Sequence, residues 1–324
     1  MQAIVFEQYG GPEQLVPAEV PTPVPEESEV LISVRAFGIN RAELYMREGL
    51  FGEVAPISGI ECVGLVADDP SGLFPHGQTV ITLMGGMGRT RNGSYAEFVC
   101  VPRETVFAIH TSLSWADLAA IPESYATAWS CLVRTLGIKG GDVVFVRGGT
   151  SALGQAAINI ARHVGATIMS STRSESKVQL LEDLGVSLVL LENGDLSSAV
   201  REQYPAGIDS VLDLIGNSTM QDSIAMVRKG GQVCMAGFLG GLEPALFDAN
   251  SLMFGVKLTA FASLLLGTPD FPLSDIPMQK LVDHVADGSY QAKPAKVFRF
   301  EQIADAHRLM ESNRANGKIV IVRS

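Results

Sequence analysis

Residues 143–165 have the order and spacing of a turn that binds a pyrophosphate group. The apolar, β-branched run 143–146 leads into Arg147-Gly148-Gly149-Thr150-Ser151-Ala152-Leu153-Gly154. Apolar residues then recur at helical spacing up to Val164, and Gly165 is typical of a helix C-terminus. A strand, a glycine-rich turn and a helix together place a phosphate at the helix N-terminus, where free backbone N–H groups attract anions. The pattern therefore predicts a dinucleotide site.

The turn fits the dinucleotide fingerprint G-x-G-x-x-G with one substitution. Gly149 and Gly154 occupy the first and last glycine positions, and Ser151 occupies the middle one. The middle residue must let the backbone approach the pyrophosphate, and serine is small and can donate a hydrogen bond. A plain tight turn would also use these glycines. The strand and helix on either side favour the dinucleotide site.

The end of the next strand indicates which dinucleotide binds. Sites for NAD usually carry an Asp or Glu there, which binds the adenosine ribose hydroxyls. This chain has Ser170-Ser171-Thr172 instead, followed by Arg173 and Lys177. Hydroxyls and cations bind a 2′-phosphate, which a carboxylate would repel. Alternatively, Ser174 caps a helix whose first turn carries two solvated cations. Capping does not explain the missing acid, so we predict NADPH.

The composition indicates a two-domain α/β enzyme. The chain has 324 residues, long for a single hydrophobic core, and 33 glycines, which suit many tight turns. A net charge of −11 without a basic cluster argues against nucleic acid or an anionic membrane as a partner. No apolar run reaches the length of a membrane-spanning helix. The N-terminal residues are typical of a strand and not of a signal peptide. The four cysteines are widely spaced. We expect a cytoplasmic protein with reduced thiols.

The pattern of predicted strands and helices changes near residue 121. Before it, short strands separated by Pro and Gly predict an antiparallel, barrel-like domain, with strands at 3–7, 29–37, 61–66, 79–82 and 94–101. After it, strands alternate with helices, which predicts a parallel sheet covered on both faces. Strands are expected at 143–147, 167–171, 187–191, 208–213, 231–236, 255–261, 295–300 and 318–322. Helices are expected at 153–164, 174–184, 195–204, 217–229, 277–287 and 303–311.

Short motifs along the whole chain carry a family resemblance. They are Gly10-Gly11-Pro12-Glu13, Gly38-Ile39-Asn40-Arg41-Ala42-Glu43, Gly59-Ile60-Glu61-Cys62-Val63-Gly64, Gly93-Ser94-Tyr95-Ala96-Glu97, Thr127-Ala128-Trp129, the glycine-rich turn and Asn316-Gly317-Lys318-Ile319-Val320. In their order and spacing the chain resembles the zinc-independent quinone oxidoreductase (zeta-crystallin-like) branch of the medium-chain dehydrogenase/reductase superfamily. The resemblance implies a GroES-like antiparallel β-barrel domain, residues 1–120 and 263–324, and a Rossmann doubly wound parallel sheet, residues 121–262, that binds NADP.

The resemblance also implies hydride transfer from NADPH to a quinone or an α,β-unsaturated carbonyl. It places Asn40 and Tyr45 beside the nicotinamide and substrate, and Thr127 at the nicotinamide ribose or amide. Each has a plainer reading, since Asn40 could cap a turn, Tyr45 could be a half-buried aromatic on a short helix, and Thr127 could pack a helix. Cofactor contacts are expected from Gly149, Thr150, Ser151, Ala152, Leu153, Gly154, Ser171, Thr172, Arg173, Lys177, Phe238, Leu239, Asn316 and Lys318.

Neither zinc site of the metal-dependent relatives is preserved. Phe37-Gly38-Ile39-Asn40 and Gly59-Ile60-Glu61 stand where those relatives have a ligand Cys and a ligand His, and hydrocarbon side chains cannot bind zinc. The structural zinc lobe needs four close cysteines, and residues 80–120 contain only Cys100. We predict no metal. Without a Lewis acid, the acceptor should be one whose reduced form is a delocalised anion, and the protein mainly orients it and supplies a proton.

Two residues depart from the family pattern. Phe51 stands where enoyl-thioester reductases have a catalytic tyrosine, so the proton would come from Tyr45 or water. Glu192 stands where quinone oxidoreductases can have a tyrosine, and it could weaken the preference for NADPH or point to solvent. Two alternatives stay open: a catalytically silent NADPH-binding protein, and an alcohol dehydrogenase with a metal bound elsewhere.

Residues 256–261 follow the predicted parallel sheet and would form its exposed edge. An unpaired edge can bind the same edge of another chain about a two-fold axis. The resemblance implies a homodimer joined there. Lys257 could instead keep the edge monomeric, since charged residues often block such edges. The only other partner expected is the small-molecule quinone or enone.

Overall fold

Residues 1–244, 246 and 248–323 are described by the computed structural model and fall into two units. The first unit contains Met1–Ala126, Leu266–Gly288 and the segment from Ala292 onward, and the second contains Thr127–Leu265 and Ser289–Gln291. The short segment belongs to the second unit because Asn159 holds it. The Asn159 Nδ2 donates to the carbonyl of Gln291 at 3.0 Å, and its Oδ1 accepts from the Gln291 N–H at 3.1 Å.

The second unit is built on a parallel sheet of six strands in the order β10-β9-β8-β11-β12-β13. The strands are β8 Val143–Arg147, β9 Thr167–Thr172, β10 Leu188–Leu191, β11 Ile208–Asp213, β12 Val227–Met235 and β13 Lys257–Ala260. Numbered along the chain, this is the doubly wound order 3-2-1-4-5-6, which reverses between its first and fourth strands. The reversal lies between β8 and β11, where Arg147 and Asp213 are neighbours in register.

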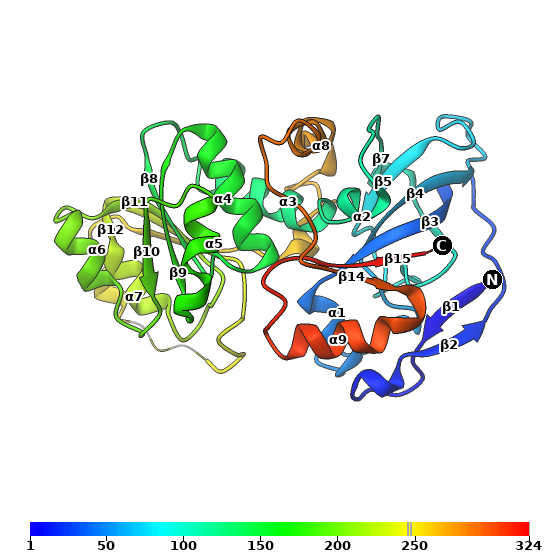
Figure 1. Ribbon diagram of the computed structural model, residues 1–324, viewed down its shortest axis with the longest axis horizontal. Coiled ribbons are helices and arrows are strands. Elements are labelled where there is room, and N and C mark those ends of the chain that lie inside the picture. The colour runs from blue at the N-terminus through cyan, green and yellow to red at the C-terminus, as the bar shows by residue number, and fades with distance from the viewer. Residues whose placement is uncertain (245, 247, 324) are drawn as a thin grey trace. The chain divides into compact units, whose positions relative to one another are not determined.

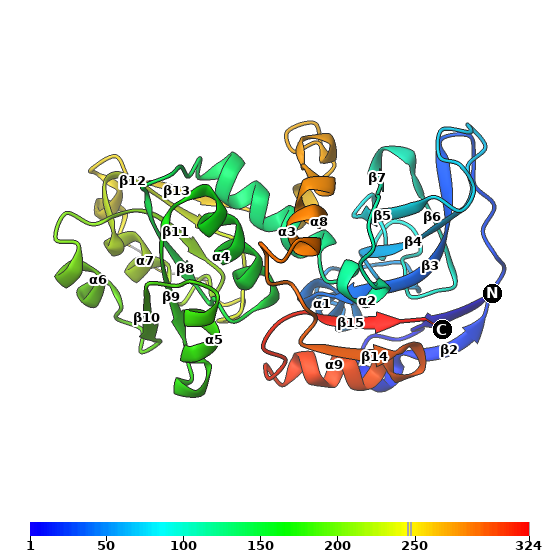
Figure 2. The ribbon, with the colours of Figure 1, turned by 45° about the horizontal axis from the view of Figure 1, so that its top comes forward.

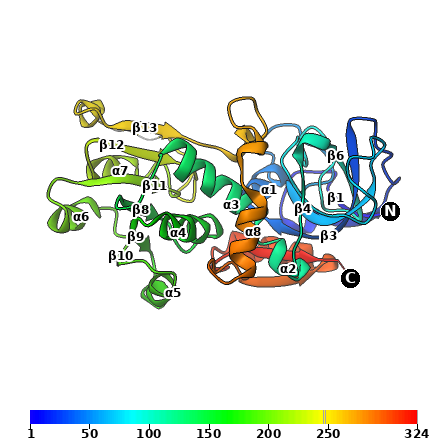
Figure 3. The same cartoon turned by 90° about the horizontal axis from the view of Figure 1, so that it is seen from above.

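Helices cover both faces of this sheet, as the alternation of strands and helices predicts. They are α4 Ala152–Val164, α5 Val178–Asp183, α6 Ser197–Gln203 and α7 Met220–Met226. Helices α4 and α5 lie on one side of the sheet and α6 and α7 on the other (Figures 1 and 3). Gly165 ends α4 in the left-handed region, with φ 87°. Ala156, Ala157 and Ile160 of that helix are buried, as predicted.

The predicted helix 217–229 is too long at both ends, because the helix that forms begins only at Met220. Helix α7 ends at Met226, and β12 begins at Val227, which pairs with Ile208 of β11. Gly230 has a φ of 69°, in the left-handed region, which ends any helical continuation. Strand pairing, which no local pattern reveals, decides the conformation of this segment.

The first unit contains a mainly antiparallel sheet in the order β14-β15-β3-β4-β5-β7, with β6 also paired to β3. Its strands are β3 Glu29–Ile39, β4 Glu61–Asp68, β5 Thr79–Leu83, β6 Phe98–Pro102, β7 Val106–Ala108, β14 Lys296–Arg299 and β15 Ile319–Val322. A separate pair joins β1 Gln2–Val5 to β2 Val16–Glu19. Strand β15 pairs with β3 although the two lie far apart in the chain, and Figure 2 shows them side by side.

Helices complete the first unit: α1 Arg41–Arg47, α2 Trp115–Leu118, α8 Met278–Ala286 and α9 Ile303–Glu311. Helix α3, Pro122–Trp129, contains the boundary with the second unit and continues as a π-helical stretch, Ser130–Thr135. The core of the unit includes Ile32, Phe37, Tyr95 and Ile321, all fully buried. In the described part of the chain, no helix has both the length and the apolar character needed to cross a membrane.

Candidate active site

The glycine-rich turn of the second unit leads directly into the N-terminus of α4. Ser151 is the N-cap of α4: its Oγ accepts from the Gly154 N–H at 3.0 Å and donates to the Gly148 carbonyl at 2.9 Å. The serine hydroxyl is therefore used within the turn. The N–H groups of Ala152 and Leu153 belong to the first helical turn and have no partner within the helix. They are the donors that could bind a pyrophosphate.

The glycines of this turn are required by close packing. A Cβ on Gly149 would lie 2.0 Å from the Oγ of Ser170, and one on Gly154 would lie 2.6 Å from the Gly148 carbonyl oxygen. Gly148 itself has a φ of 86°, which favours glycine. Packing alone would thus keep the glycines, so the phosphate-binding assignment depends on the free amides and on the residues that follow β9.

The end of β9 combines buried hydroxyls with exposed cations. Ser171 and Thr172 are buried, while Arg173 is exposed and Lys177 is partly exposed. Within the described part of the chain, no ion pair engages the side chain of Arg173 or Lys177. Ser174 stands at the N-cap of a short 3-10 helix, Glu175–Lys177, but its hydroxyl bonds to that of Ser176 at 2.8 Å and makes no capping bond. Two cations are therefore available for a phosphate.

A buried ion pair that the sequence did not reveal lies next to these hydroxyls. Arg147 is fully buried, and its Nε and Nη2 donate to the two carboxylate oxygens of Glu192 at 3.0 and 2.5 Å. Its Nη1 lies 2.7 Å from a carboxylate oxygen of Asp222. Burial lowers the pKa of Arg147, but the hydrogen bonds and charge of Glu192 and the charge of Asp222 outweigh it and raise that pKa. The arginine is held as a cation.

Glu192 does not point to solvent, and that alternative is wrong. Its side chain is 11% exposed, and besides Arg147 it accepts a hydrogen bond from the Ser171 Oγ at 3.1 Å. The Ser171 hydroxyl also accepts from the Gly148 N–H at 3.3 Å. An arginine at the end of a buried strand was the one signal in the sequence that an acid must lie nearby.

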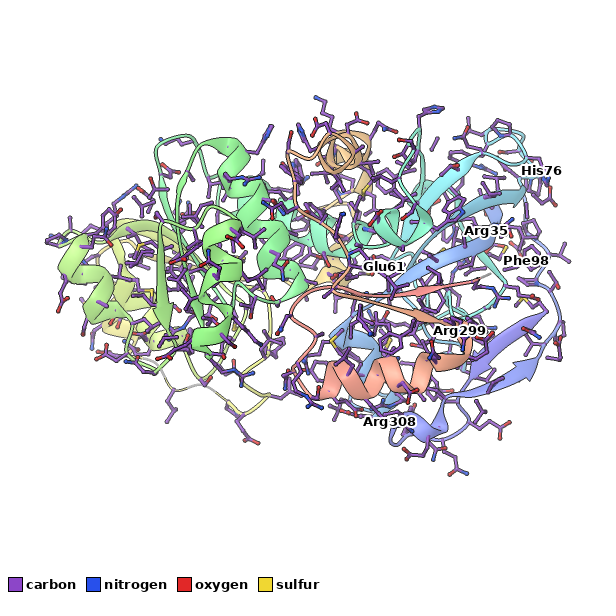
Figure 4. All side chains as sticks on the ribbon, viewed as in Figure 1. Arg35, Glu61, His76, Phe98, Arg299 and Arg308 are labelled. Atoms are coloured by element: carbon purple, nitrogen blue, oxygen red, sulfur yellow. The ribbon has the colours of Figure 1, made fainter. Side chains whose placement is uncertain are left out.

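The first unit holds a second buried polar cluster, around Asn40 and Glu61. The Lys318 Nζ donates to the Asn40 Oδ1 at 2.6 Å and to the Ser124 Oγ at 3.2 Å, and it lies 2.6 Å from the Glu61 Oε1. The Asn40 Nδ2 donates to the same Glu61 oxygen at 2.9 Å. Glu61, at the start of β4 in the interior of the unit (Figure 4), is fully buried. These contacts fix the orientation of the Asn40 carboxamide.

Glu43 completes the cluster, and its carboxyl group is fully buried. Burial, reinforced by the charge of Glu61, raises the pKa of Glu43 to about 8. Its carboxyl oxygens accept from the Asn40 backbone N–H at 2.9 Å and, more weakly, from the Ile60 N–H at 3.4 Å. The Asn40 Nδ2 also lies 3.4 Å from Glu43. At neutral pH the Glu43 carboxyl therefore keeps its proton.

The other expected residues lie on separate elements of the two units. Tyr45 is half-buried on α1, with its ring centroid 6.2 Å from that of Phe51, and burial raises its pKa. Thr127 is buried in α3. In the second unit, Phe238 and Leu239 follow β12. Asn316, in the first unit, is exposed, with a φ of 57°.

The positions of the zinc ligands are filled by packed hydrocarbon. Ile60 is 2% exposed, and Phe37 stacks on Tyr95 with centroids 4.8 Å apart. Among the described residues, no group of three or more His, Cys, Asp or Glu side chains could hold a metal ion. His76 lies at the rim of the first unit (Figure 4).

His307 has a structural role instead. It is fully buried, and burial and the charge of Arg47 lower its pKa to about 3. Its Nδ1 accepts from the Arg47 Nη1 at 3.2 Å, so the imidazole proton is on Nε2, which lies 3.0 Å from the Tyr95 hydroxyl.

Comparison with known proteins identifies families and solved structures that are similar to this chain. The alcohol dehydrogenase GroES-like domain matches residues 26–111, and the zinc-binding dehydrogenase family matches residues 152–277. The quinone oxidoreductase of Lama guanicoe is 27% identical, over 99% of this chain and 97% of that relative. A mycobacterial protein solved with NADPH is 25% identical with a TM-score of 0.89, and an NAD-dependent alcohol dehydrogenase is 26% identical with a TM-score of 0.87, each over 99% of both chains.

The chain belongs to the medium-chain dehydrogenase/reductase superfamily, and its GroES-like and Rossmann-like parts confirm the predicted fold. It is an oxidoreductase of this type, with quinone oxidoreductases among the relatives that match its whole length.

Proposed function

We propose that this protein is an NADPH-dependent, zinc-independent oxidoreductase that reduces a quinone or an α,β-unsaturated carbonyl. The observation that carries the proposal is that the N-terminus of α4 lies in the same unit as two cations just beyond β9, Arg173 and Lys177, which form no ion pair among the described residues. Amides at a helix N-terminus suit a pyrophosphate, and the cations suit the 2′-phosphate that distinguishes NADPH from NADH.

The proposed cofactor contacts follow the predicted set, with one change. The turn residues Gly149–Gly154, the strand end at Ser171 and Thr172, and Phe238, Leu239 and Asn316 stay in the proposed set. Ser151 contributes through the backbone of the turn, because its hydroxyl already donates to the Gly148 carbonyl. Lys318 differs, because its three N–H groups already have partners in Asn40, Ser124 and Glu61. We assign it the role of holding the Asn40 carboxamide in place.

In the proposed mechanism, residues of the first unit supply hydrogen bonds and a proton, and the hydride would come from bound NADPH. The weaker bond of the Asn40 Nδ2, at 3.4 Å to Glu43, leaves one of its N–H groups free to be redirected to the oxygen of the acceptor. Donation there stabilises the negative charge that develops as the acceptor is reduced. The raised pKa of Tyr45 keeps its phenol protonated at neutral pH, and it or water supplies the proton.

The absence of zinc in this proposal has its own support. The description of one matching family names zinc, yet the positions that would carry the ligands hold Phe37 and Ile60. Both are buried among apolar residues and offer no donor atom. The acceptor must then be one that needs no Lewis acid, which favours quinones and enones over simple ketones. Four free cysteines suit the reducing cytoplasm as the location.

The test is turnover of the purified protein. NADPH and NADH are each mixed with a panel of quinones and enones, and cofactor oxidation is followed by absorbance. We expect turnover with NADPH, and a loss of about tenfold or more in kcat for Asn40→Ala but not for the surface variant Asn250→Ala. Binding of NADPH without oxidation by any acceptor would identify a silent NADPH-binding protein and contradict the proposal.

A further inference from the structure

The second unit carries an acid at the cofactor-facing end of its sheet, although β9 itself ends without one. Glu192 directly follows β10, the neighbour of β9, and accepts a hydrogen bond from the Ser171 Oγ at 3.1 Å. In sites for NAD, an acid at the end of the second strand binds the ribose hydroxyls. Here β9 is that second strand. The Glu192 carboxylate therefore lies one hydrogen bond away from the end of β9, where an acid would bind the ribose hydroxyls of NADH.

Arg147 binds both oxygens of this carboxylate. The guanidinium donates to both oxygens of Glu192, from Nε at 3.0 Å and from Nη2 at 2.5 Å, in the bidentate geometry that arginine and carboxylate favour. The arginine is the last residue of β8, on the other side of β9 from Glu192. Its side chain is 0% exposed, so it acts on a cofactor through Glu192 and not by contact.

The other two acids near Arg147 do not depend on it in the same way. Asp222 accepts from the backbone N–H groups of Leu196 and Ser197 at 3.1 and 2.9 Å, and Asp213 accepts from two further backbone N–H groups, at 2.9 and 3.0 Å. Glu192 receives a single backbone N–H, that of Gly194, at 3.3 Å. Its negative charge is therefore the one that Arg147 chiefly balances.

We propose that Arg147 is a specificity-determining residue, which secures the preference for NADPH by neutralising Glu192. Without the arginine, the carboxylate would repel a 2′-phosphate bound at Arg173 and Lys177 and would be free to accept hydrogen bonds from the ribose hydroxyls of NADH. The proposal rests on the proposed function, because it needs the 2′-phosphate to bind beside β9. Arg147 is a positioning residue in this scheme, since it need not touch the cofactor.

The experiment measures the dissociation constants of NADPH and NADH by fluorescence titration, without any acceptor. The variants are Arg147→Met, Glu192→Gln and the double variant, and the control is Arg47→Met, which removes an equally buried arginine from the first unit. We expect Arg147→Met to shift the NADPH-to-NADH affinity ratio about tenfold toward NADH, as expected for one unscreened charge near the phosphate. The double variant should return the ratio to within about threefold of wild type, because Glu192 is then neutral.

The outcomes separate this inference from a structural role and from failure of the proposed function. If Arg147 only stabilised the fold, its loss would weaken both cofactors equally, and an unchanged ratio would overturn the inference. If Arg147→Met does not fold, Glu192→Gln decides: it should raise the preference for NADPH about threefold, because Arg147 then faces one carboxylate fewer. No shift in that variant also overturns the inference. A wild-type protein without preference for NADPH overturns the proposed cofactor itself.

Discussion

The ammonium of Lys318 donates a hydrogen bond to the Oδ1 of Asn40 at 2.6 Å, joining residues 278 positions apart in the chain. The same ammonium lies 2.6 Å from Glu61, and both charged side chains are almost completely buried. A buried pair of this kind contributes little net stability compared with apolar residues, but breaking it leaves an uncompensated charge. Orientation of Asn40 and stability of the first unit are therefore linked through one lysine.

Replacing Lys318 tests this link. We expect Lys318→Met to destabilise the first unit by about 3–5 kcal/mol, because Glu61 is left buried and unpaired. The double variant Lys318→Met/Glu61→Gln should recover much of that loss, since no charge remains buried. Urea unfolding followed by circular dichroism measures both. Equal destabilisation in the single and double variants would show that packing, and not charge, is responsible.

The stability of the first unit should fall as the pH rises because of Glu43. Its pKa is raised from 4.5 to about 8 on folding, so between these values the folded state holds a proton that the unfolded state has lost. Stability from this group is complete below pH 4.5 and is lost as the pH rises toward 8, with a slope of up to about 1.4 kcal/mol per pH unit. Unfolding of wild type and Glu43→Gln from pH 5 to 8 checks it. The variant should lack this part of the slope, and parallel curves would contradict the prediction.

The cofactor preference should depend on Arg173. Arg173→Ala should weaken NADPH binding by about 1.5–3 kcal/mol, the scale of a charge-assisted hydrogen bond, and leave NADH nearly unchanged. Isothermal titration with each cofactor measures this. Arg308→Ala, an exposed arginine of the first unit (Figure 4), serves as the control and should change neither affinity. Equal binding of both cofactors by the wild-type protein would refute the prediction.

Activity should not need a metal. Since Ile60 stands in place of a ligand histidine, we expect turnover to survive exhaustive chelation, and the purified protein to contain no stoichiometric zinc by elemental analysis. Loss of activity with EDTA, restored by added zinc, would identify a metal enzyme and reject the zinc-independent assignment.

The open edge of β13 should join two chains. In the described part of the chain, β13 pairs with β12 alone and is the last strand of the sheet. Edge-to-edge pairing about a two-fold axis would satisfy its free backbone groups. Light scattering at micromolar concentration should give twice the 34.5 kDa of one chain. A mass of one chain would mean that Lys257 keeps the edge unpaired.

The sequence predicts the secondary structure and the parallel sheet of this protein better than it predicts the contacts between polar side chains. Alternating strands and helices are enough to predict the parallel sheet, because each segment has a clear apolar period. Strand β2 was missed, since Val16–Glu19 contains Pro17 and is mostly exposed, without the alternation of a half-buried strand. The Arg147–Glu192 pair was also missed. It joins the ends of strands that are not adjacent in the sheet, and no local pattern encodes such a contact.

In the candidate site, too, the residues could be predicted from the sequence but their contacts could not. The motifs pointed to Asn40 and Lys318 separately, with one expected at the substrate and the other at the cofactor. Their direct contact follows from the pairing of β15 with β3, which brings the last strand beside the first long one. The raised pKa of Glu43 likewise depends on burial beside Glu61, and a sequence motif gives the residue type without its surroundings.

The position of β15 has a consequence for how the chain matures during synthesis. This strand lies between β14 and β3, and Lys318 immediately precedes it. A nascent chain that has not yet emerged to residue 322 therefore lacks an interior strand of the sheet in the first unit. In such a chain Lys318 is not yet available to pair with Glu61. The whole of 127–265 has by then left the ribosome. The polar cluster can thus form only after Lys318 has emerged, and a product terminated before that residue would contain Asn40 and Glu61 without the lysine that contacts both.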